Sequence, residues 1–387
     1  MNSEKTNLTG RLVQITQDSN SCLAFVPNPL PPSLEIDTEI VCELSEAYLA
    51  LGELAGLGRT MTNPNLLIRP FIRREAVLSS RIEGTQADIA NLYAYEQGQL
   101  SLPGILPSPP VSDVQEVLNY VRTLEYGLER LKTFPICKRF MCELHERLVD
   151  GVRGETATPG QFRKMQNWIG SKGMNIKDAR FIPPPVPELE ECLNQLEHYL
   201  NNTCIYPPLI RIGLIHYQFE TIHPFLDGNG RIGRLLISVL LLKWNLLPLP
   251  LLYLSAFFEH HRQTYYDLML GVSYSGKWKD WLLFFLKGVT EQSKDAVVRS
   301  KQLQDLQLGW RQKLTQARAT ALLLRLADSL LDSPIVTIPQ AQEILDVTYR
   351  SAQQNVEKLV NAGILVQVSE GYGKVFIAPA VLQIIGE

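Results

Sequence analysis

The sequence predicts a mainly α-helical protein with one small β-hairpin in its core and a helix-turn-helix unit with a two-stranded wing near its C-terminal end. Three observations support this fold class. Over most of the chain, apolar residues recur every three or four positions, as on the buried face of a helix. Residues 159–185 instead combine turn residues, aromatics and β-branched residues, which is typical of a short hairpin. Residues 316–387 follow a separate pattern of adjoining helices and two short strands.

Composition limits the class of protein. The 387 residues are 45% hydrophobic with a net charge of −3, which suits two or three globular domains with a substantial core. The near-balanced charge gives no electrostatic case for broad binding to nucleic acid or to anionic membranes. The six cysteines form no C-x-x-C pair, and residues 1–16 lack the apolar region of a signal peptide. We therefore expect reduced cysteines in the core, a cytoplasmic location and no membrane span.

The N-terminal part, residues 1–110, is predicted to be a helical segment. Four prolines exclude a helix from residues 1–33, which we expect to be an irregular, extended lead-in. Helical spacing of apolar residues predicts one helix over residues 36–57 and another from just after Pro70 to about Gly98. A proline-rich stretch then marks the boundary with the next domain.

The second of these helices carries Ser-Ser-Arg-Ile-Glu-Gly, residues 79–84. Ser79 and Glu83 are four residues apart and therefore lie on the same helix face.

Residues 111–292 are predicted to form the core domain. Apolar spacing places helices over residues 112–131, 135–148, 189–201 and 207–222, and the last of these ends just before His223. His145 and His216 fall on these helices, and we interpret both as structural residues.

Residues 223–234, His-Pro-Phe-Leu-Asp-Gly-Asn-Gly-Arg-Ile-Gly-Arg, have a composition suited to phosphate chemistry. Three glycines precede an apolar run, so the stretch is predicted to be a loop leading into a helix N-terminus, where backbone N–H groups and small residues admit a phosphate. A carboxylate there, Asp227, indicates Mg²⁺, and His223 indicates a general base. Arg231 and Arg234, three residues apart, can donate to phosphate oxygens. The stretch predicts phosphoryl or nucleotidyl transfer; the alternative is a buried turn histidine beside a solvated arginine face.

The C-terminal part is predicted to be a connecting helix, residues 293–315, and a separate domain, residues 316–387. In that domain we expect helices over residues 319–331, 338–345 and 349–360, then a wing with glycines at its tip. The domain has five lysines and arginines against seven aspartates and glutamates. Because DNA-reading modules are basic on the face they present, DNA is not an expected partner, and protein contact or dimerisation is favoured.

Residues 223–234 resemble the signature of the Fic family, His-Pro-Phe-x-Asp-Gly-Asn-Gly-Arg-x-x-Arg, at every specified position. The resemblance implies a Fic-type helical core that transfers AMP from ATP to a Ser, Thr or Tyr hydroxyl of a target protein, and also of the protein itself. It implies that His223 is the catalytic base and that Asp227 holds Mg²⁺. The residues it assigns to ATP in this motif are Gly228, Asn229, Gly230, Arg231, Gly233 and Arg234.

Ser79, Glu83 and Gly84 resemble the inhibitory motif [Ser/Thr]-x-x-x-Glu-[Gly/Asn] that many Fic proteins carry N-terminal to the core. The resemblance implies that Glu83 pairs with Arg234. An arginine held by a carboxylate cannot also hold the γ-phosphate, so ATP would be excluded or bound in a poor pose. The alternative is a solvated helix glutamate.

Three further segments resemble parts of Fic proteins. The hairpin at residues 159–185 corresponds to a flap that pairs with an extended segment of the target, although an ordinary surface hairpin fits equally. Tyr265 and Tyr266 stand where the family often has a tyrosine pair near the adenine; the alternative is a helix face with one ring in the core. The C-terminal domain resembles a winged helix, and we expect a homodimer.

Other functions remain open. Fic relatives that transfer phosphate depart from the signature where this chain has Gly230, which argues against that reaction. Removal of AMP is an alternative because Glu83 could position a water molecule. A non-catalytic winged-helix regulator is a third, against which stand the complete signature and the acidic C-terminal domain.

Overall fold

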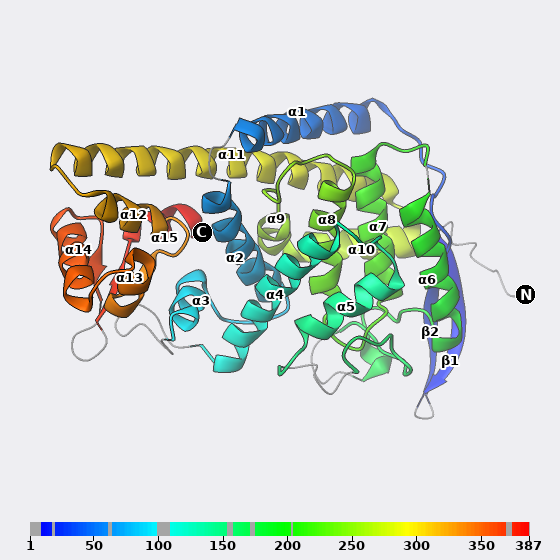
Figure 1. Ribbon diagram of the computed structural model, residues 1–387. Coiled ribbons are helices and arrows are strands. Elements are labelled where there is room, and N and C mark those ends of the chain that lie inside the picture. Colours follow the sequence, from blue (N-terminus) through cyan, green and yellow to red (C-terminus); the bar gives the residue numbers. More distant parts are fainter. Residues whose placement is uncertain are drawn as a thin grey trace, which may run out of the picture.

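The computed structural model describes residues 9–17, 20–60, 64–98, 109–152, 158–170, 175–202, 204–368 and 374–386. These residues are mainly helical, with two small antiparallel sheets (Figure 1). The predicted mainly α fold class is confirmed. The helices up to the end of the core are α1 (Thr38–Thr60), α2 (Asn65–Ile82), α3 (Ile89–Glu96), α4 (Val111–Arg130), α5 (Lys138–Leu148), α6 (Val186–Asn201), α7 (Pro208–Ile222), α8 (Asn229–Lys243), α9 (Ser255–His260), α10 (Arg262–Ser275) and α11 (Trp278–Gln316).

Helix α8 lies at the centre of the core. Every residue from Asn229 to Leu241 is buried, which requires a helix that is apolar almost all round. Helix α7 packs against it, and the loop between the two helices carries the residues of greatest chemical interest. Helix α2 crosses the same region and contacts α4, α8 and α9, so the predicted inhibitory residues and the predicted phosphate loop meet.

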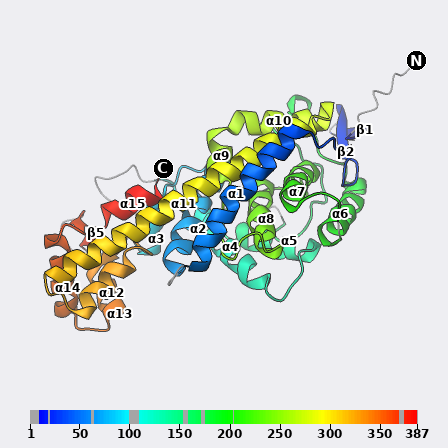
Figure 2. The ribbon, with the colours of Figure 1, turned by 90° about the horizontal axis from the view of Figure 1, so that it is seen from above.

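Helix α11 runs along the length of the molecule beside α1, from the core to the C-terminal helices (Figures 1 and 2). It continues without a break through residues 292 and 293, so the predicted connecting helix is the second half of α11. Trp281 and Phe285, at the start of the helix, are fully buried in the core, while its far end packs against α12 (Ala321–Ser329).

The N-terminal lead-in was predicted to be irregular, and that prediction is wrong. Strands β1 (Gly10–Gln17) and β2 (Asn20–Pro27) form an antiparallel hairpin in which Leu12 pairs with Phe25. The prolines exclude a helix but not a strand, since they begin only where β2 ends. The N–H of Phe25 donates to the carbonyl of Ile182 at 2.9 Å, which joins this hairpin to the predicted flap.

The predicted flap is present as a single antiparallel bridge between Ile169 and Phe181. The N–H of Ile169 donates to the carbonyl of Phe181 at 2.8 Å, and the N–H of Arg180 donates to the carbonyl of Ile169 at 2.8 Å. The tip, residues 171–174, lies outside the described residues.

Two boundaries near the predicted inhibitory motif differ from expectation. Helix α2 begins before Pro70 and ends at Ile82, because Gly84 takes a left-handed φ of 98° that terminates the helix. The predicted single helix to Gly98 is therefore two helices, α2 and α3. The proline-rich boundary segment lies mostly outside the described residues.

The C-terminal part contains α12, α13 (Ile338–Leu345), α14 (Tyr349–Asn361) and α15 (Pro379–Ile385), with a three-stranded sheet of β3 (Ile335–Thr337), β4 (Val366–Gln367) and β5 (Val375–Ile377) in the order β3–β5–β4. The predicted helices and the two predicted strands are present, while β3 and α15 were not foreseen. The tip of the wing lies outside the described residues, and the assignment as a winged helix stays a prediction.

All six cysteines are free, and Cys42 is exposed rather than part of the core. Within the described part of the chain, we find no helix with the length and apolar character that a membrane crossing requires.

Candidate active site

His223 is the C-cap of α7 and adopts a left-handed conformation with a φ of 49°. Its Nδ1 lies 3.2 Å from the carbonyl oxygen of Glu220. Because a carbonyl oxygen can only accept, Nδ1 carries the proton and the lone pair of Nε2 is the acceptor of the ring. Burial lowers the pKa of His223 to about 4, so the ring is neutral at neutral pH. This is the tautomer and charge state that a general base requires.

The loop after His223 is closed on itself. Phe225 donates its N–H to Oδ1 of Asn229 and accepts from Nδ2 of the same side chain, both at 2.8 Å. Asn229 is 2% exposed, and its amide stabilises the loop. The amide is therefore not directed at a phosphate, contrary to the prediction that Asn229 contacts ATP. Gly228 then takes a left-handed φ of 77°, which lets the chain turn into α8.

His145 supports the same loop from α5. The N–H of Gly160 donates to its Nδ1 at 3.1 Å, so Nε2 carries the proton and donates to the carbonyl of Asp227 at 3.1 Å. Its ring stacks on Phe225 at 3.9 Å. Burial lowers the pKa of His145 to about 4. The prediction that His145 is structural agrees with these contacts.

Asp227 is the one acidic residue of the loop. Its Oδ1 accepts the N–H of Gly228 at 2.6 Å and lies 3.6 Å from Nη2 of Arg231, and about a third of the side chain is exposed. Among the described residues, no three His, Cys, Asp or Glu side chains form a metal cage. A single, partly exposed carboxylate nevertheless suits Mg²⁺, which proteins commonly hold with one or two carboxylates together with substrate phosphates.

Arg231 was predicted to donate to phosphate oxygens together with Arg234, but its side chain is turned into the protein. Its side chain is fully buried and donates to Oε2 of Glu116 on α4 at 3.0 Å. Residues three apart differ in direction by about 60° around a helix. Arg231 therefore points towards α4 and Arg234 towards α2. In this structure Arg231 anchors α8 and the Asp227 loop.

Arg234 is held by helix α2. Its Nε donates to Oγ of Ser79 at 2.9 Å, and its Nη2 donates to the carbonyl of Ser79 at 2.9 Å and to Oε1 of Glu83 at 2.8 Å. Burial opposes the charge of both partners, but their mutual attraction raises the pKa of Arg234 and lowers the pKa of Glu83. The pair is therefore ionised. The structure brings Ser79, Glu83 and Arg234 together, while Gly84 ends the helix beside them.

Two glycines of α8 leave room for carboxylates. A Cβ at Gly230 would collide with Oε1 of Glu83 and lie 2.9 Å from Nη1 of Arg234. A Cβ at Gly233 would collide with Glu220 in the same way. Burial raises the pKa of Glu220 to about 8, so this carboxyl is neutral at neutral pH and Glu83 is the charged partner of Arg234.

The two tyrosines that were predicted to lie near an adenine differ in their exposure. Tyr265 is 1% exposed, and its hydroxyl lies 2.8 Å from Nε2 of His216, so it belongs to the core and is not open to an adenine. His216 is likewise a packing residue, as predicted. Tyr266 is half-buried, and the guanidinium of Arg180 lies 5.8 Å from its ring centroid. Arg180 is also paired with Asp267 and so links the flap to α10.

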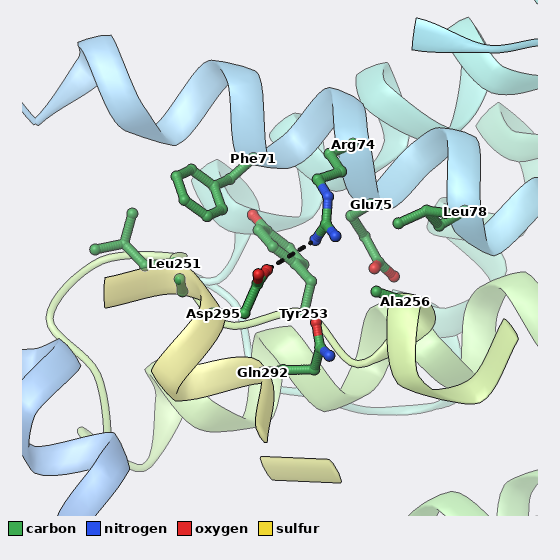
Figure 3. A pocket seen from close by; sticks show the side chains of 10 residues that line it. Phe71, Arg74, Glu75, Leu78, Leu251, Tyr253, Ala256, Gln292 and Asp295 are labelled. Carbon is green, nitrogen blue, oxygen red and sulfur yellow. Dashed lines mark ion pairs between the residues drawn. The ribbon is translucent and has the colours of Figure 1, made fainter. Parts of the chain in front are cut away.

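Sequence analysis missed two residues that hold the His223 turn, Arg163 and Asn167, which both donate to backbone carbonyls there. Both residues lie in the predicted hairpin, residues 159–185, but their contacts with the backbone of the His223 turn have no sequence signal. It also missed Glu75 on α2, whose Oε1 accepts from Tyr120 at 3.0 Å and from Ser255 at 2.6 Å. Figure 3 shows Glu75 and Arg74 side by side in a small pocket of about 10 Å³, where Arg74 pairs with Asp295. Burial raises the pKa of Glu75 to about 7.

Two sequence models of one family match the chain. The model described as "Fic/DOC family N-terminal" matches residues 41–129, and the model described as "Fic/DOC family" matches residues 135–241. Together the matches span just over half of the chain and include both α2 and the His223 loop.

Known proteins similar to this chain carry the same family name. "Protein adenylyltransferase Fic" from Aedes aegypti is 27% identical over 221 residues, which is 55% of this chain and 39% of that protein. The match therefore spans well under half of that relative's length. The protein of the same name from Nematostella vectensis is 26% identical over 316 residues, which is 80% of this chain and 68% of that protein.

Solved structures share the fold. A Fic family protein from Desulfovibrio desulfuricans superposes with a TM-score of 0.58 at 19% identity, covering 90% of this chain and 98% of that one. A Fic domain containing signaling protein from Bacteroides thetaiotaomicron gives a TM-score of 0.52 at 18% identity, covering 66% of this chain and 95% of that one. At this level of identity the likeness concerns the fold alone.

Proposed function

Because the chain belongs to the Fic/DOC family, we propose that it is a protein adenylyltransferase that transfers AMP from ATP to a Ser, Thr or Tyr hydroxyl of a target protein. The observation that carries the proposal is the state of His223, which is neutral, protonated on Nδ1 and next to a glycine-lined helix N-terminus. The relatives named protein adenylyltransferase support the same reaction.

In the proposed reaction, Nε2 of His223 takes the proton of the target hydroxyl. The hydroxyl oxygen forms a bond to the α-phosphorus of ATP, the bond from that phosphorus to the bridging oxygen breaks, and pyrophosphate leaves with the electron pair. The N-terminal N–H groups of α8 would donate to phosphate oxygens. Asp227 would hold Mg²⁺, which neutralises phosphate charge when bound. Arg234, once free of Glu83, would donate to the γ-phosphate that departs.

Glu83 is proposed to inhibit this reaction. Its carboxylate occupies the guanidinium of Arg234 and lies over Gly230, in the first turn of the proposed phosphate-binding helix. An ionised carboxylate at that point both removes a donor from the γ-phosphate and repels it. The inhibited state is therefore one in which ATP binds weakly or with its α-phosphate out of line.

The test is labelling with ATP that carries a tag on its α-phosphate, in the presence of Mg²⁺. Wild type, Glu83→Gly and Glu83→Gly with His223→Ala are compared. Strong labelling by Glu83→Gly alone supports both the transfer and the inhibition. Equal labelling by wild type and Glu83→Gly would contradict the proposed inhibition. Labelling that persists in the variant without His223 would contradict its proposed role as the base.

Removal of AMP from a modified target is the second candidate. Glu83 is ionised, partly exposed and near His223, so it could orient a water molecule towards a phosphodiester. The oxygen of water would then form a bond to phosphorus as the bond to the target oxygen breaks, and the proton that water loses would pass through Nε2 of His223 to the departing target oxygen. Release of AMP from a pre-labelled protein by wild type, lost in Glu83→Gly, is the result expected for this reaction.

A further inference from the structure

The turn that follows α7 leaves a row of backbone carbonyls that need partners. The chain reverses at His223 in a left-handed conformation, and Pro224 follows, which has no N–H. A left-handed histidine is strained and persists only where its surroundings fix it. The carbonyls of residues 222–225 lie along this turn, and each accepts a hydrogen bond from residue 163 or 167, in the part of the predicted flap that comes before the Ile169–Phe181 bridge.

Arg163 supplies three of these bonds. Its backbone N–H donates to the carbonyl of Pro224 at 2.9 Å, its Nε donates to the carbonyl of His223 at 3.0 Å, and its Nη2 reaches the carbonyl of Ile222 at 3.5 Å. The same Nη2 also donates to the carbonyl of Pro184, on the far side of the flap, at 2.5 Å. Arg163 is 2% exposed, so its charged guanidinium is buried, and the backbone carbonyl oxygens supply the hydrogen-bond partners that a buried charge needs.

Asn167 supplies the remaining bonds. Its Nδ2 donates to the carbonyl of Phe225 at 2.8 Å and to that of His223 at 3.2 Å. Both partners are acceptors, which identifies the bonded atom as the amide nitrogen. The carbonyl of His223 thus accepts from two side chains, Arg163 and Asn167, on one side, while the ring is held through Nδ1 by Glu220 on the other.

We propose that Arg163 and Asn167 are positioning residues of the transfer reaction, which hold the backbone of His223 so that its Nδ1–H stays on Glu220 and its Nε2 faces the target hydroxyl. The inference rests on the proposed function. It also gives the flap a second role, because the segment that carries both residues continues directly into Ile169, the residue of the flap bridge. A target that pairs with the flap would therefore dock against the same backbone that orients the base.

The structure offers a matched control for each residue. Asn119 is also a buried asparagine whose Nδ2 donates to two carbonyls, those of Leu148 at 3.3 Å and Asp150 at 2.7 Å. Arg211 likewise donates through Nη2 to two carbonyls, at 3.0 and 2.9 Å. Neither control contacts the His223 turn through these bonds.

The test compares Asn167→Leu with Asn119→Leu, and Arg163→Lys with Arg211→Lys, all in the Glu83→Gly background. Labelling rates are measured per folded molecule across a range of ATP concentrations. A base displaced by about 1 Å can cost roughly a hundredfold in rate. We expect kcat to fall by about ten- to a hundredfold in the two variants at the turn while KM for ATP changes by less than about threefold. The two controls should keep kcat.

The ring of His223 gives a second readout that needs no turnover. Nitrogen NMR of labelled histidine reports which ring nitrogen carries the proton and at which pH the ring titrates. In Asn167→Leu the Nδ1–H form should give way to a mixture, and the pKa should move towards its ordinary value; in Asn119→Leu neither should change. If KM rises in step with the loss of kcat, or if the controls lose kcat equally, the inference is overturned. If the Glu83→Gly parent does not label at all, the proposed function fails, and the NMR comparison alone decides the positioning role.

Discussion

Glu83→Gln tests the ion pair between Glu83 on α2 and Arg234 on α8 most directly, because it removes one charge and keeps the shape of the side chain. Arg234 is 2% exposed and would lose its only carboxylate partner among the described residues, while Ser79 would still accept two hydrogen bonds. Removal of one member of a fully buried pair costs roughly 3–5 kcal/mol. Glu83 is 30% exposed, and Ser79 remains, so we expect about 1–2 kcal/mol here.

The free energy by which the Glu83–Arg234 pair stabilises the nucleotide-free protein should oppose the binding of ATP by the same amount. Under the proposed inhibition, ATP would have to displace Glu83 from Arg234 in wild type before its γ-phosphate takes that place. An ion pair that stabilises the inhibited state by about 1–2 kcal/mol should therefore weaken the apparent affinity for ATP by about five- to thirtyfold. The variant does not pay this penalty, and ATP at about a hundred times its dissociation constant stabilises a protein by about 2.7 kcal/mol.

The assay is thermal unfolding of wild type and Glu83→Gln with and without ATP and Mg²⁺. We expect the variant to melt lower than wild type without nucleotide and to gain more from ATP. Glu96→Gln is the matched control, because Glu96 forms an equally close pair with Arg73 at 2.9 and 3.0 Å but lies on α3, away from Arg234. The reasoning is refuted if ATP raises the melting temperature of wild type and of Glu83→Gln by the same amount.

Three further predictions concern the same region. Since burial raises the pKa of Glu75 to about 7, the folded state binds the proton of Glu75 more tightly than the unfolded state does. The free energy of unfolding of wild type should therefore fall by roughly 3 kcal/mol between about pH 4.5 and 7, while that of Glu75→Gln does not show this fall. Parallel pH profiles of the two proteins in urea unfolding would contradict this. Gly230→Ala should destabilise wild type more than it destabilises Glu83→Gly, by about 1 kcal/mol in a double-mutant cycle, because the new methyl group collides with the Glu83 carboxylate; additive effects would show that the contact is not made. Since burial lowers the pKa of His223 to about 4, the labelling rate of Glu83→Gly should be level from about pH 6 to 8, and a fall centred near the ordinary histidine value would argue against this buried base.

The helical part of the fold was predictable because its elements are amphipathic or apolar over many turns. The helix that became α14 was expected over residues 349–360 and runs over Tyr349–Asn361. The misses have local causes. The strands of β1 and β2 were overlooked because the prolines that follow them dominated the interpretation of the whole lead-in. Pro70 was taken as a helix start, although α2 tolerates it in its second turn, and Gly84 was not recognised as the end of that helix.

The candidate site was predictable only as a set of residue types. The signature indicated which side chains are candidates for phosphate chemistry, and the short motif on α2 indicated the glutamate that lies against Arg234. The burial of Arg231, Asn229 and Tyr265 could not be predicted, because the partners that bury them are Glu116 on α4, the backbone of Phe225 and His216 on α7. A sequence pattern specifies a polar side chain but not whether it will meet a ligand or another part of the protein.

The division of labour within the signature follows from these partners. Arg231 and Asn229 face inward and bond to protein groups, so they fix the shape of the loop. Arg234 is instead held by Ser79 and by the carboxylate of Glu83, on a different helix. Of the two arginines, only the one on the α2 side can therefore be switched without dismantling the loop. A shift of the C-terminal end of α2, where Gly84 already ends the helix, would free Arg234 and leave Arg231, Asn229 and His145 in place. The expected activated state is thus one in which α2 moves and the His223 loop does not.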